Sequence, residues 1–190
     1  ALRWLLLLAL FTGMRQGELC QLQTTDVEQD ESGVWVFRVR AEADAQHLKT
    51  EAAERTVPLH SDLIRCGFLE YVQRLPKGRV FPGLKPGGPD GKLNTYLSKA
   101  FTAYRRSVGV TRPRLVYHSL RKNAAQALKN AGVSANQIAE LIGHARGFTI
   151  ETYAPHGLPV LALQELVEKI SYPRLDLSHL SVDREQRSAE

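Results

Sequence analysis

Near its start the chain reads Leu2-Arg3-Trp4-Leu5-Leu6-Leu7-Leu8-Ala9-Leu10-Phe11-Thr12-Gly13. The stretch from residue 2 to residue 11 is apolar almost all the way round a helix, which predicts a helix at the centre of a domain. Gly13 is a natural helix terminator, because glycine adopts a left-handed conformation at low cost. The run is far short of the ~20 apolar residues that cross a bilayer, so we expect no membrane span.

Patterns around this helix predict a mainly α domain with a small antiparallel β-sheet, an α+β fold. Strands are expected over residues 34–40 and 55–59, where β-branched and aromatic residues gather, with a further strand and turn within 41–54. Further helices are expected over about 16–22, 61–74, 94–108, 119–131, 134–143 and 161–170. Tyr71, Tyr96 and Tyr104 fall in apolar helical patterns and are expected to pack in the core.

Composition sets the class of partner only loosely. The chain has 190 residues and a net charge of +5, which favours a polyanionic partner without establishing nucleic acid. Cys20 and Cys66 are the only cysteines and have no ligand-like spacing. A reducing, cytosolic setting without a zinc site is the simplest interpretation.

Two arginines stand near predicted helix starts, Arg15 after Gly13 and Arg121 three residues after His118. A guanidinium group grips two phosphate oxygens at once and keeps its charge, so both are candidates for binding a phosphodiester. Either one alone is more typical of a solvated helix surface. Glu18 lies three residues after Arg15, so on a helix it can contact that arginine from the same face and hold it in position.

Three further side chains are candidates for proton transfer or phosphate contact. His118 at a helix start can exchange a proton near neutral pH, although a histidine there, taken alone, more often makes a structural hydrogen bond. His144 follows Gly143 at a predicted helix end, where it can face a cleft or simply cap the helix. Lys49 lies in a polar turn, where it is either an acid for a leaving 5′ oxygen or an ordinary exposed lysine.

Tyr153 lies in a polar stretch nine positions after His144. A phenol with a pKa of ~10 is a poor nucleophile at neutral pH, but nearby cations stabilise its phenolate. Its attack on phosphorus would give a phosphotyrosine that conserves the energy of the cleaved bond for rejoining.

Neither a metal nor a cofactor is expected. The one dense acidic run, residues 26–31, indicates a solvated loop more than a metal-binding carboxylate cluster. No glycine-rich nucleotide motif is present.

In this order the motifs resemble those of the catalytic domain of the tyrosine site-specific recombinases, the phage-integrase type. Residues 12–19 look like the first-arginine box, residues 49–59 like the β-hairpin lysine segment, and residues 118–121 like the His-x-Leu-Arg motif. Residues 141–144 and Tyr153 look like the second histidine and the nucleophile. The resemblance covers about residues 4–170, and the lysine segment lacks the glycine usual in its turn.

The resemblance implies a role for each candidate. Arg15 and Arg121 would bind the scissile phosphate, and Tyr153 would attack it to leave a 3′-phosphotyrosine. Lys49 would be the general acid and His118 would assist proton transfer. His144 would hydrogen-bond the phosphate, and Glu18 would support the site without touching substrate.

The resemblance also implies an organisation and a setting. Residues 1–172 would form the catalytic domain and 173–190 a C-terminal tail, with an N-terminal DNA-binding domain absent from this chain. The implied reaction is metal-independent cleavage and rejoining of double-stranded DNA, to integrate or excise a mobile element. The chain would be a monomer in isolation and a homotetramer on DNA, with residues 158–170 docking onto a neighbour. The resemblance further implies accessory DNA-bending factors and a cytoplasmic location, in a bacterium or a phage-infected host.

Other functions remain open at this point. A type IB topoisomerase-like enzyme shares the phosphotyrosine chemistry, but the compact span and the motif spacing favour a recombinase. A non-catalytic helical DNA-binding module would use the same arginines and basic surface. The presence of all six catalytic residue types favours an enzyme over such a module, and over a structural helical protein with chance motif matches.

Overall fold

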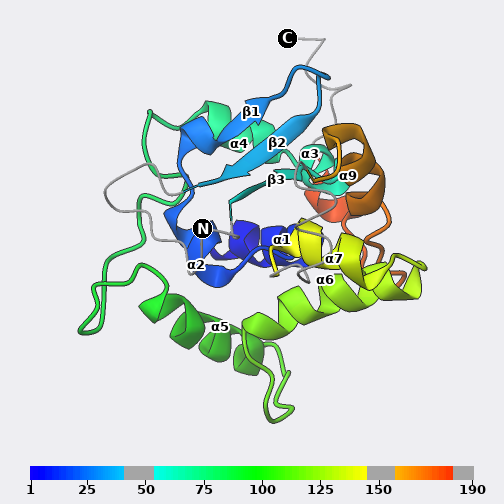
Figure 1. The fold of residues 1–190 in the computed structure, drawn as a ribbon. Helices are drawn as coiled ribbons and strands as arrows, with labels where there is room; N and C mark the ends of the chain where they lie inside the picture. Colours follow the sequence, from blue (N-terminus) through cyan, green and yellow to red (C-terminus); the bar gives the residue numbers. More distant parts are fainter. Residues whose placement is uncertain (41–53, 145–156, 182–190) are drawn as a thin grey trace.

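The computed structural model describes residues 1–40, 54–144 and 157–181. These residues form a helical domain with one small antiparallel sheet, as the sequence predicts (Figure 1). Lys49 and Tyr153 lie outside the described residues. The elements, with two short 3₁₀ turns labelled η, are α1 (Leu2–Thr12), α2 (Gln16–Gln21), η1 (Thr24–Asp26), β1 (Val27–Gln29), β2 (Trp35–Val39), β3 (Arg55–Pro58), α3 (Ser61–Arg65), α4 (Phe68–Gln73), α5 (Thr95–Ser107), α6 (His118–Asn130), α7 (Ala135–Ile142), α9 (Val160–Val167) and η3 (Ser178–Leu180).

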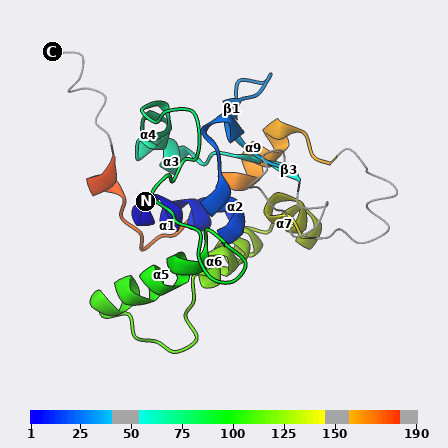
Figure 2. The same cartoon turned by 90° about the vertical axis from the view of Figure 1, so that its left-hand side faces the viewer.

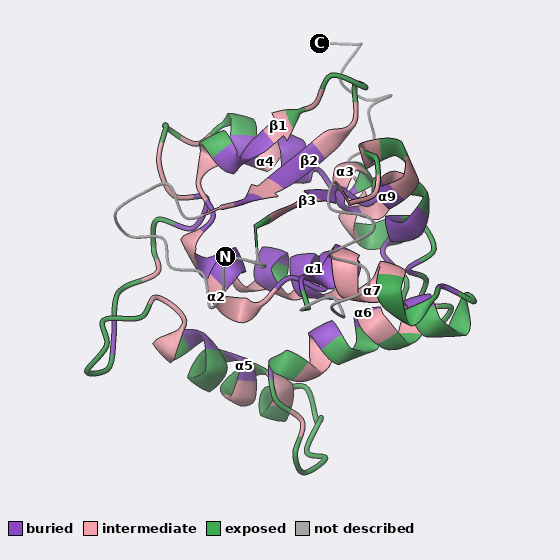
Figure 3. Cartoon of the chain, viewed as in Figure 1, coloured by how far each residue is buried: buried purple, intermediate pink, exposed green. Residues whose placement is uncertain are grey.

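Helix α1 lies at the centre of the fold, as its apolar sequence predicts. It contacts α2, α3, α5 and α6, and most of its length is buried (Figure 3). Leu5 and Leu8 are fully buried, and each contributes about 1.5–3 kcal/mol of hydrophobic stabilisation. The helix ends at Gly13, whose φ of 62° is left-handed. Among the described residues, no helix is both long and apolar enough to cross a membrane.

The sheet has the strand order β1-β2-β3 and both pairings are antiparallel. Phe37 on β2 pairs with Val27 on β1 and Val57 on β3, and all three side chains are buried. Phe37 also packs against Phe68 of α4, with ring centroids 5.7 Å apart. Helices α7 and α9 contact β3, so this strand joins the sheet to the helical part of the domain.

Two predictions about secondary structure were wrong. Residues 61–74 form two helices instead of one, because Gly67 adopts a left-handed φ of 84° between α3 and α4. His60 caps α3, by accepting a hydrogen bond from the Asp62 backbone N–H. Strand β1 was missed, since three residues are too few to show an alternating pattern.

The prediction that Tyr96 and Tyr104 pack in the core was also wrong. Their exposed fractions are 52% and 45%, and Leu97 and Phe101 are the buried residues of α5. Helix α5 packs against the rest of the domain along one narrow stripe. There the rings of Phe101 and Tyr117 meet edge to face, with their centroids 5.7 Å apart. Tyr71, by contrast, is half-buried and donates its hydroxyl hydrogen bond to the Val80 carbonyl.

The chain beyond α7 returns to the core. Helix α9 buries Leu163, Leu166 and Val167 and contacts β3 and α7 of its own chain. The resemblance had implied that residues 158–170 dock onto a neighbour. Further on, the Tyr172 hydroxyl donates to the Leu10 carbonyl of α1, and Leu177 is buried.

Replacing Gly13 by alanine should destabilise the fold more than an ordinary glycine substitution. A left-handed φ costs a residue with a Cβ about 1–2 kcal/mol. The new methyl group would lie 2.8 Å from Ile142 Cγ2, and such overpacking costs about a further 1–3 kcal/mol. Gly132→Ala is the matched control, because Gly132 has a φ of 77° and nothing within 4 Å of its added Cβ. Urea unfolding measures both, and equal losses would contradict the close packing of Gly13 against Ile142.

Candidate active site

Four of the predicted site residues come from three helix ends that meet beside α1. Arg15 is the residue before α2, His118 and Arg121 lie in the first turn of α6, and His144 follows the end of α7. Glu18 lies in the first turn of α2, where its carboxylate accepts from both the backbone and the side chain of Arg15. The predicted contact between Glu18 and Arg15 is therefore present, at 2.8 Å between Nη1 and Oε1.

Local sequence determines where α7 begins and ends. Ser134 accepts a hydrogen bond from the Gln137 backbone N–H, which is a capping box at the helix start. At the other end Gly143 is left-handed, with a φ of 72°. The Gly143 N–H donates to the Glu140 carbonyl and the His144 N–H to the Ala139 carbonyl, which is a Schellman motif. The motif leaves the carbonyls of residues 141–143 available to other donors.

Three arginines bind those three consecutive carbonyls. Arg55 Nε donates to the Leu141 carbonyl at 3.0 Å, Arg121 Nη1 donates to the Ile142 carbonyl at 2.6 Å, and Arg15 Nη2 donates to the Gly143 carbonyl. Arg121 Nη1 also donates to the carbonyl of Gly13 at 2.6 Å. The end of a helix carries partial negative charge on such carbonyls, so it can hold cations close together.

The sequence analysis missed Arg55 as a member of this site. It lies on β3 and donates from Nη1 and Nη2 to the two oxygens of Glu18, at 3.2 and 3.0 Å. Its side chain is 8% exposed and that of Glu18 is 4% exposed, so this is a buried ion pair. A Cβ on Gly143 would lie 2.5 Å from Arg55 Nη1, so only glycine leaves room for the guanidinium group. Arg55 begins a strand in the sequence pattern, and nothing local signals a partner 37 positions away.

One nitrogen of the Arg121 guanidinium group makes no hydrogen bond within the described residues. The residue is 4% exposed, and within the described part of the chain its buried Nη2 has no hydrogen-bond partner. A buried donor without a partner costs free energy, which a bound acceptor would recover. Arg15, with a side chain 24% exposed, is the neighbouring guanidinium group that solvent reaches.

The crowding of positive charge shifts several pKa values. Burial lowers the pKa of Arg121 to about 10, and Arg15 and Arg55 contribute while Glu18 opposes them, so the group stays charged at neutral pH. Burial also lowers the pKa of His118 and of His144, and the charges of Arg121 and Arg15 lower both further. Both imidazoles are therefore neutral at pH 7, and each can accept one proton.

Glu18 is the counter-charge of the cluster. Burial by itself raises the pKa of this carboxyl group, but the charge of Arg55 and the hydrogen bonds from Arg55 and Arg15 outweigh it, so the net pKa is lowered. Glu18 is thus a carboxylate at neutral pH and holds two guanidinium groups in place.

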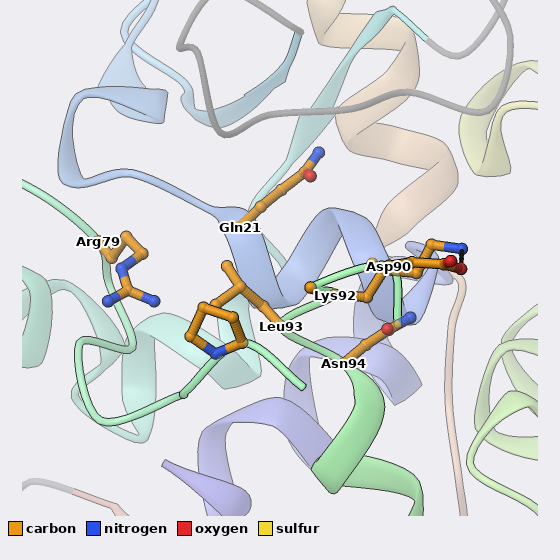
Figure 4. A pocket seen from close by; sticks show the side chains of 9 residues that line it. Gln21, Arg79, Asp90, Lys92, Leu93 and Asn94 are labelled. Carbon is orange, nitrogen blue, oxygen red and sulfur yellow. Dashed lines mark hydrogen bonds and ion pairs between the residues drawn. The ribbon is translucent and has the colours of Figure 1, made fainter. Parts of the chain in front are cut away.

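A hollow of about 580 Å³ lies beside α2. Gln21 of α2 and Lys92, Leu93 and Asn94 from the chain leading into α5 line it, together with Arg79 (Figure 4). None of the predicted site residues lines it. In the described part of the chain, no three His, Cys, Asp or Glu side chains gather as a metal site would require.

The segment that carries Tyr153 lies outside the described residues, but the chain on both sides of it is attached to α7. Before it, the His144 N–H donates to the Ala139 carbonyl at 2.8 Å. After it, the Leu158 N–H donates to the Glu140 carboxylate. The described residues on both sides of residues 145–156 are therefore bonded to the same helix, the one whose end binds the three arginines.

Comparison with known proteins identifies relatives of this arrangement. Residues 1–157 match the model of the phage integrase family. A XerC-like tyrosine recombinase from Caldanaerobacter subterraneus subsp. tengcongensis is 28% identical over 191 residues, which cover 83% of this chain and 46% of the relative.

Two solved structures share the fold. The integrase from mycobacterium phage Brujita superposes with a TM-score of 0.60 and 21% identity, covering 94% of this chain and 55% of the integrase. The XerA recombinase superposes with a TM-score of 0.51 and 20% identity, covering 87% of this chain and 59% of the recombinase. The chain thus spans about half the length of the proteins that it matches.

Arg55→Met should cost about 3 kcal/mol of folding stability, the lower end for breaking a buried ion pair, because Arg15 still contacts Glu18. Arg38→Met is the matched control. Arg38 pairs with Glu28 at 2.7 Å, but the two side chains are 31% and 43% exposed, and such a pair contributes less than about 1 kcal/mol. Urea unfolding at pH 7 separates the two variants, and equal losses would count against a buried pair at Arg55.

The loss in Arg55→Met should also depend on pH. The pKa of Glu18 is lowered in the folded state, so its stabilisation is complete above the ordinary value of 4.5 and is lost as the pH falls through the folded-state pKa. The stability difference between the wild type and Arg55→Met should therefore shrink as the pH falls below 4.5.

Proposed function

This chain belongs to the phage integrase family, and from that premise we propose that it breaks and rejoins DNA strands through a 3′-phosphotyrosine intermediate. The observation that carries the proposal is the buried Arg121 guanidinium group. One of its nitrogens is held by two backbone carbonyls and the other has no described partner, directly beside the charge of Arg15. A phosphate oxygen is an acceptor of the right charge for that vacant donor.

Arg15 and Arg121 would hold the non-bridging oxygens of the scissile phosphate. Both are fixed to the backbone before substrate arrives, so little reorganisation is required as negative charge develops in the transition state. The neutral His144 would donate a hydrogen bond to the same phosphate. Glu18 and Arg55 would not touch substrate, and they would hold Arg15 and the end of α7 in position.

Tyr153 would supply the nucleophile. Its Oη would bond to phosphorus as the bond from phosphorus to the 5′ oxygen breaks, and the phenol proton would pass to the neutral His118. Lys49 would give a proton to the leaving 5′ oxygen. Rejoining reverses these steps, because the 5′ hydroxyl attacks phosphorus and the bond to Tyr153 breaks. The bond energy stays in the phosphotyrosine, so neither a metal nor a nucleotide is required in this scheme.

The proposal extends to the assembly and its setting. We assign the described fold to a catalytic domain over residues 1–172, which would act on double-stranded DNA as a homotetramer and be monomeric without it. The reaction would integrate or excise a mobile element in the cytoplasm of a bacterium or of a phage-infected host.

A covalent protein–DNA adduct should form through Tyr153. The substrate is a library of nicked duplexes with a randomised core, in which cleavage releases a short strand and traps the enzyme. Denaturing gels should show an adduct with the wild type and none with Tyr153→Phe. Tyr104→Phe, which removes an exposed hydroxyl, is the matched control and should behave as the wild type. An adduct that persists in Tyr153→Phe would refute the nucleophile, and DNA retention without any adduct would favour a binding module.

Arg121→Lys should reduce the rate of adduct formation by about 10²–10³, the effect of removing one donor to a transition-state oxyanion. Lysine keeps the charge, but one ammonium group cannot both hold two carbonyls and present a second nitrogen to phosphate. Arg74→Lys, on the surface after α4, should leave the rate unchanged. Near-normal cleavage by Arg121→Lys would remove Arg121 from the site.

A further inference from the structure

Arg15 lies in the turn between α1 and α2. Gly13 ends α1 in a left-handed conformation, and Arg15 is the residue before α2. The Arg15 backbone N–H donates to Glu18 at 2.7 Å, and the Arg15 carbonyl accepts from the Leu19 N–H at 3.0 Å, so the backbone of the arginine moves with α2. The angle between α1 and α2 therefore decides where the Arg15 side chain starts.

Helix α5 is attached to both of these helices. It lies on the side of α1 away from the sheet (Figures 1 and 2). It packs against α1, and Leu97 and Phe101 are its buried residues. At its start it is bonded to α2 through the side chain of Gln16, the first residue of that helix. A helix that contacts both α1 and α2 can hold the angle between them.

The Gln16 amide makes the contact with the start of α5. Its Nε2 donates to the Asn94 carbonyl and to Ser98 Oγ, both at 3.1 Å. The Ser98 hydroxyl also lies 3.3 Å from Gln16 Oε1, to which it can donate instead. Within the described part of the chain, every hydrogen bond that joins α2 to the start of α5 comes from this one amide. Both of its N–H groups have acceptors, so the orientation of the amide is fixed.

Close packing does not replace this contact. The hollow of about 580 Å³ lies between α2 and the chain leading into α5, with Gln21 on one wall and Leu93 and Asn94 on another (Figure 4). A space of this kind leaves the groups that line it without the dispersion contacts that would otherwise hold two elements together. The position of α5 relative to α2 therefore depends on the Gln16 amide.

The start of α5 is itself firmly held. Thr95 Oγ1 donates to the Gly87 carbonyl at 2.7 Å. A Cβ on Gly87 would lie 2.4 Å from the Tyr96 ring, so the chain leading into α5 runs directly against the first turn of the helix. The acceptors of Gln16 thus belong to a structured unit and not to a single exposed side chain.

We propose that Gln16 is a positioning residue, which joins α5 to α2 and thereby fixes the backbone of Arg15 relative to Arg121. The hydrogen bonds from the Arg15 guanidinium group to Glu18 and Gly143 hold the end of the side chain, and Gln16 holds its origin. The effect on DNA cleavage rests on the proposed function. Gln16 would not touch substrate, and its loss would displace a phosphate-binding group, for which an error of about 1 Å can cost about 10²-fold in rate.

Gln16→Met tests this role, because methionine keeps the length and helix propensity of glutamine but has no amide. The rate of adduct formation at saturating DNA should fall about tenfold, less than the full effect because Glu18 and Gly143 still hold the guanidinium group. Affinity for the same duplex, measured in a Tyr153→Phe background, should change by less than about twofold, since the misplacement acts mainly in the transition state.

Gln126→Met is the matched control. Gln126 is exposed on α6, the helix that carries Arg121, and its Nε2 donates within that helix to Asn130 at 2.7 Å. The same substitution there removes a similar hydrogen bond that joins no second element, so the rate should equal that of the wild type.

Ser98 supplies a second test, from a position 82 residues along the chain from Gln16. Ser98→Ala should slow adduct formation, and the double variant Gln16→Met, Ser98→Ala should be no slower than Gln16→Met, because both changes remove one contact. Ser98→Thr keeps the hydroxyl and should keep the rate. Ser107→Ala, which removes a hydroxyl that donates to the Tyr104 carbonyl of the same helix, should keep it too.

A measurement without cleavage distinguishes this proposal from the proposed function. The Arg15 Nε–H signal in a proton–nitrogen NMR spectrum, assigned by its loss in Arg15→Lys, should move in Ser98→Ala and stay in place in Ser107→Ala. If the wild type forms no adduct but this signal moves in Ser98→Ala, the proposed function fails and the coupling of α5 to Arg15 stands.

Three results would overturn the proposal. The first is an Arg15 signal that does not move in Ser98→Ala. The second is a Gln16→Met variant whose urea midpoint falls but whose rate at saturating DNA is that of the wild type, because Gln16 would then have a structural role alone. The third is a double variant in which the two rate losses add, since Gln16 and Ser98 would then act separately.

Discussion

The end of helix α7 is the constraint on which the site depends. Three guanidinium groups from three separate elements bind the carbonyls of residues 141–143, which the Schellman motif leaves without partners inside the helix. The contacts satisfy acceptors that would otherwise be buried and unpaired, and they fix the arginines before any substrate arrives. Because the carbonyls are consecutive, moving one arginine disturbs the positions of the other two. Gly143 permits this approach, since a Cβ there would lie 2.5 Å from Arg55 Nη1.

Three positive groups this close together repel one another, so the cluster needs compensation. The helix end supplies part of it through its partial negative charge, and the carboxylate of Glu18 supplies the rest. Burial is the main cause of the lowered pKa of Arg121 and of both histidines, but the charges of neighbouring arginines lower these pKa values further, so the compensation is incomplete. A bound phosphate would remove the remaining imbalance. It would also raise the pKa of His118 and His144, which favours proton uptake by these imidazoles only when the site is occupied.

Short-range signals in the sequence predicted much of this arrangement. Gly13 and Gly143 end their helices with left-handed φ values, and Ser134 caps α7, because each of these features depends on neighbours within a few residues. The pairing of Glu18 with Arg15 follows from helical spacing in the same way. Arg55 could not be found by this route, since its partners lie 37 and 86 positions away and only the tertiary fold joins them. The prediction that Tyr96 and Tyr104 are buried was wrong for the opposite reason. Their spacing is that of a core-facing stripe, but α5 has too few neighbours to cover them.

This chain therefore carries two kinds of positive charge, which differ in how strongly salt screens them. The site arginines are largely withdrawn from water and fixed by hydrogen bonds, so salt screens them weakly and their effect depends on geometry. Arg106, Arg112 and Lys122, on α5, α6 and the connection between them, are exposed and pair with no carboxylate in the described part of the chain, so salt screens them strongly and their effect depends on number. If the chain binds DNA as proposed, this separation would allow its affinity to change through surface substitutions while the cluster at the end of α7 stays intact. It also explains why both can lie in one stretch of chain, since α6 places Arg121 inward and Lys122 outward on adjacent positions.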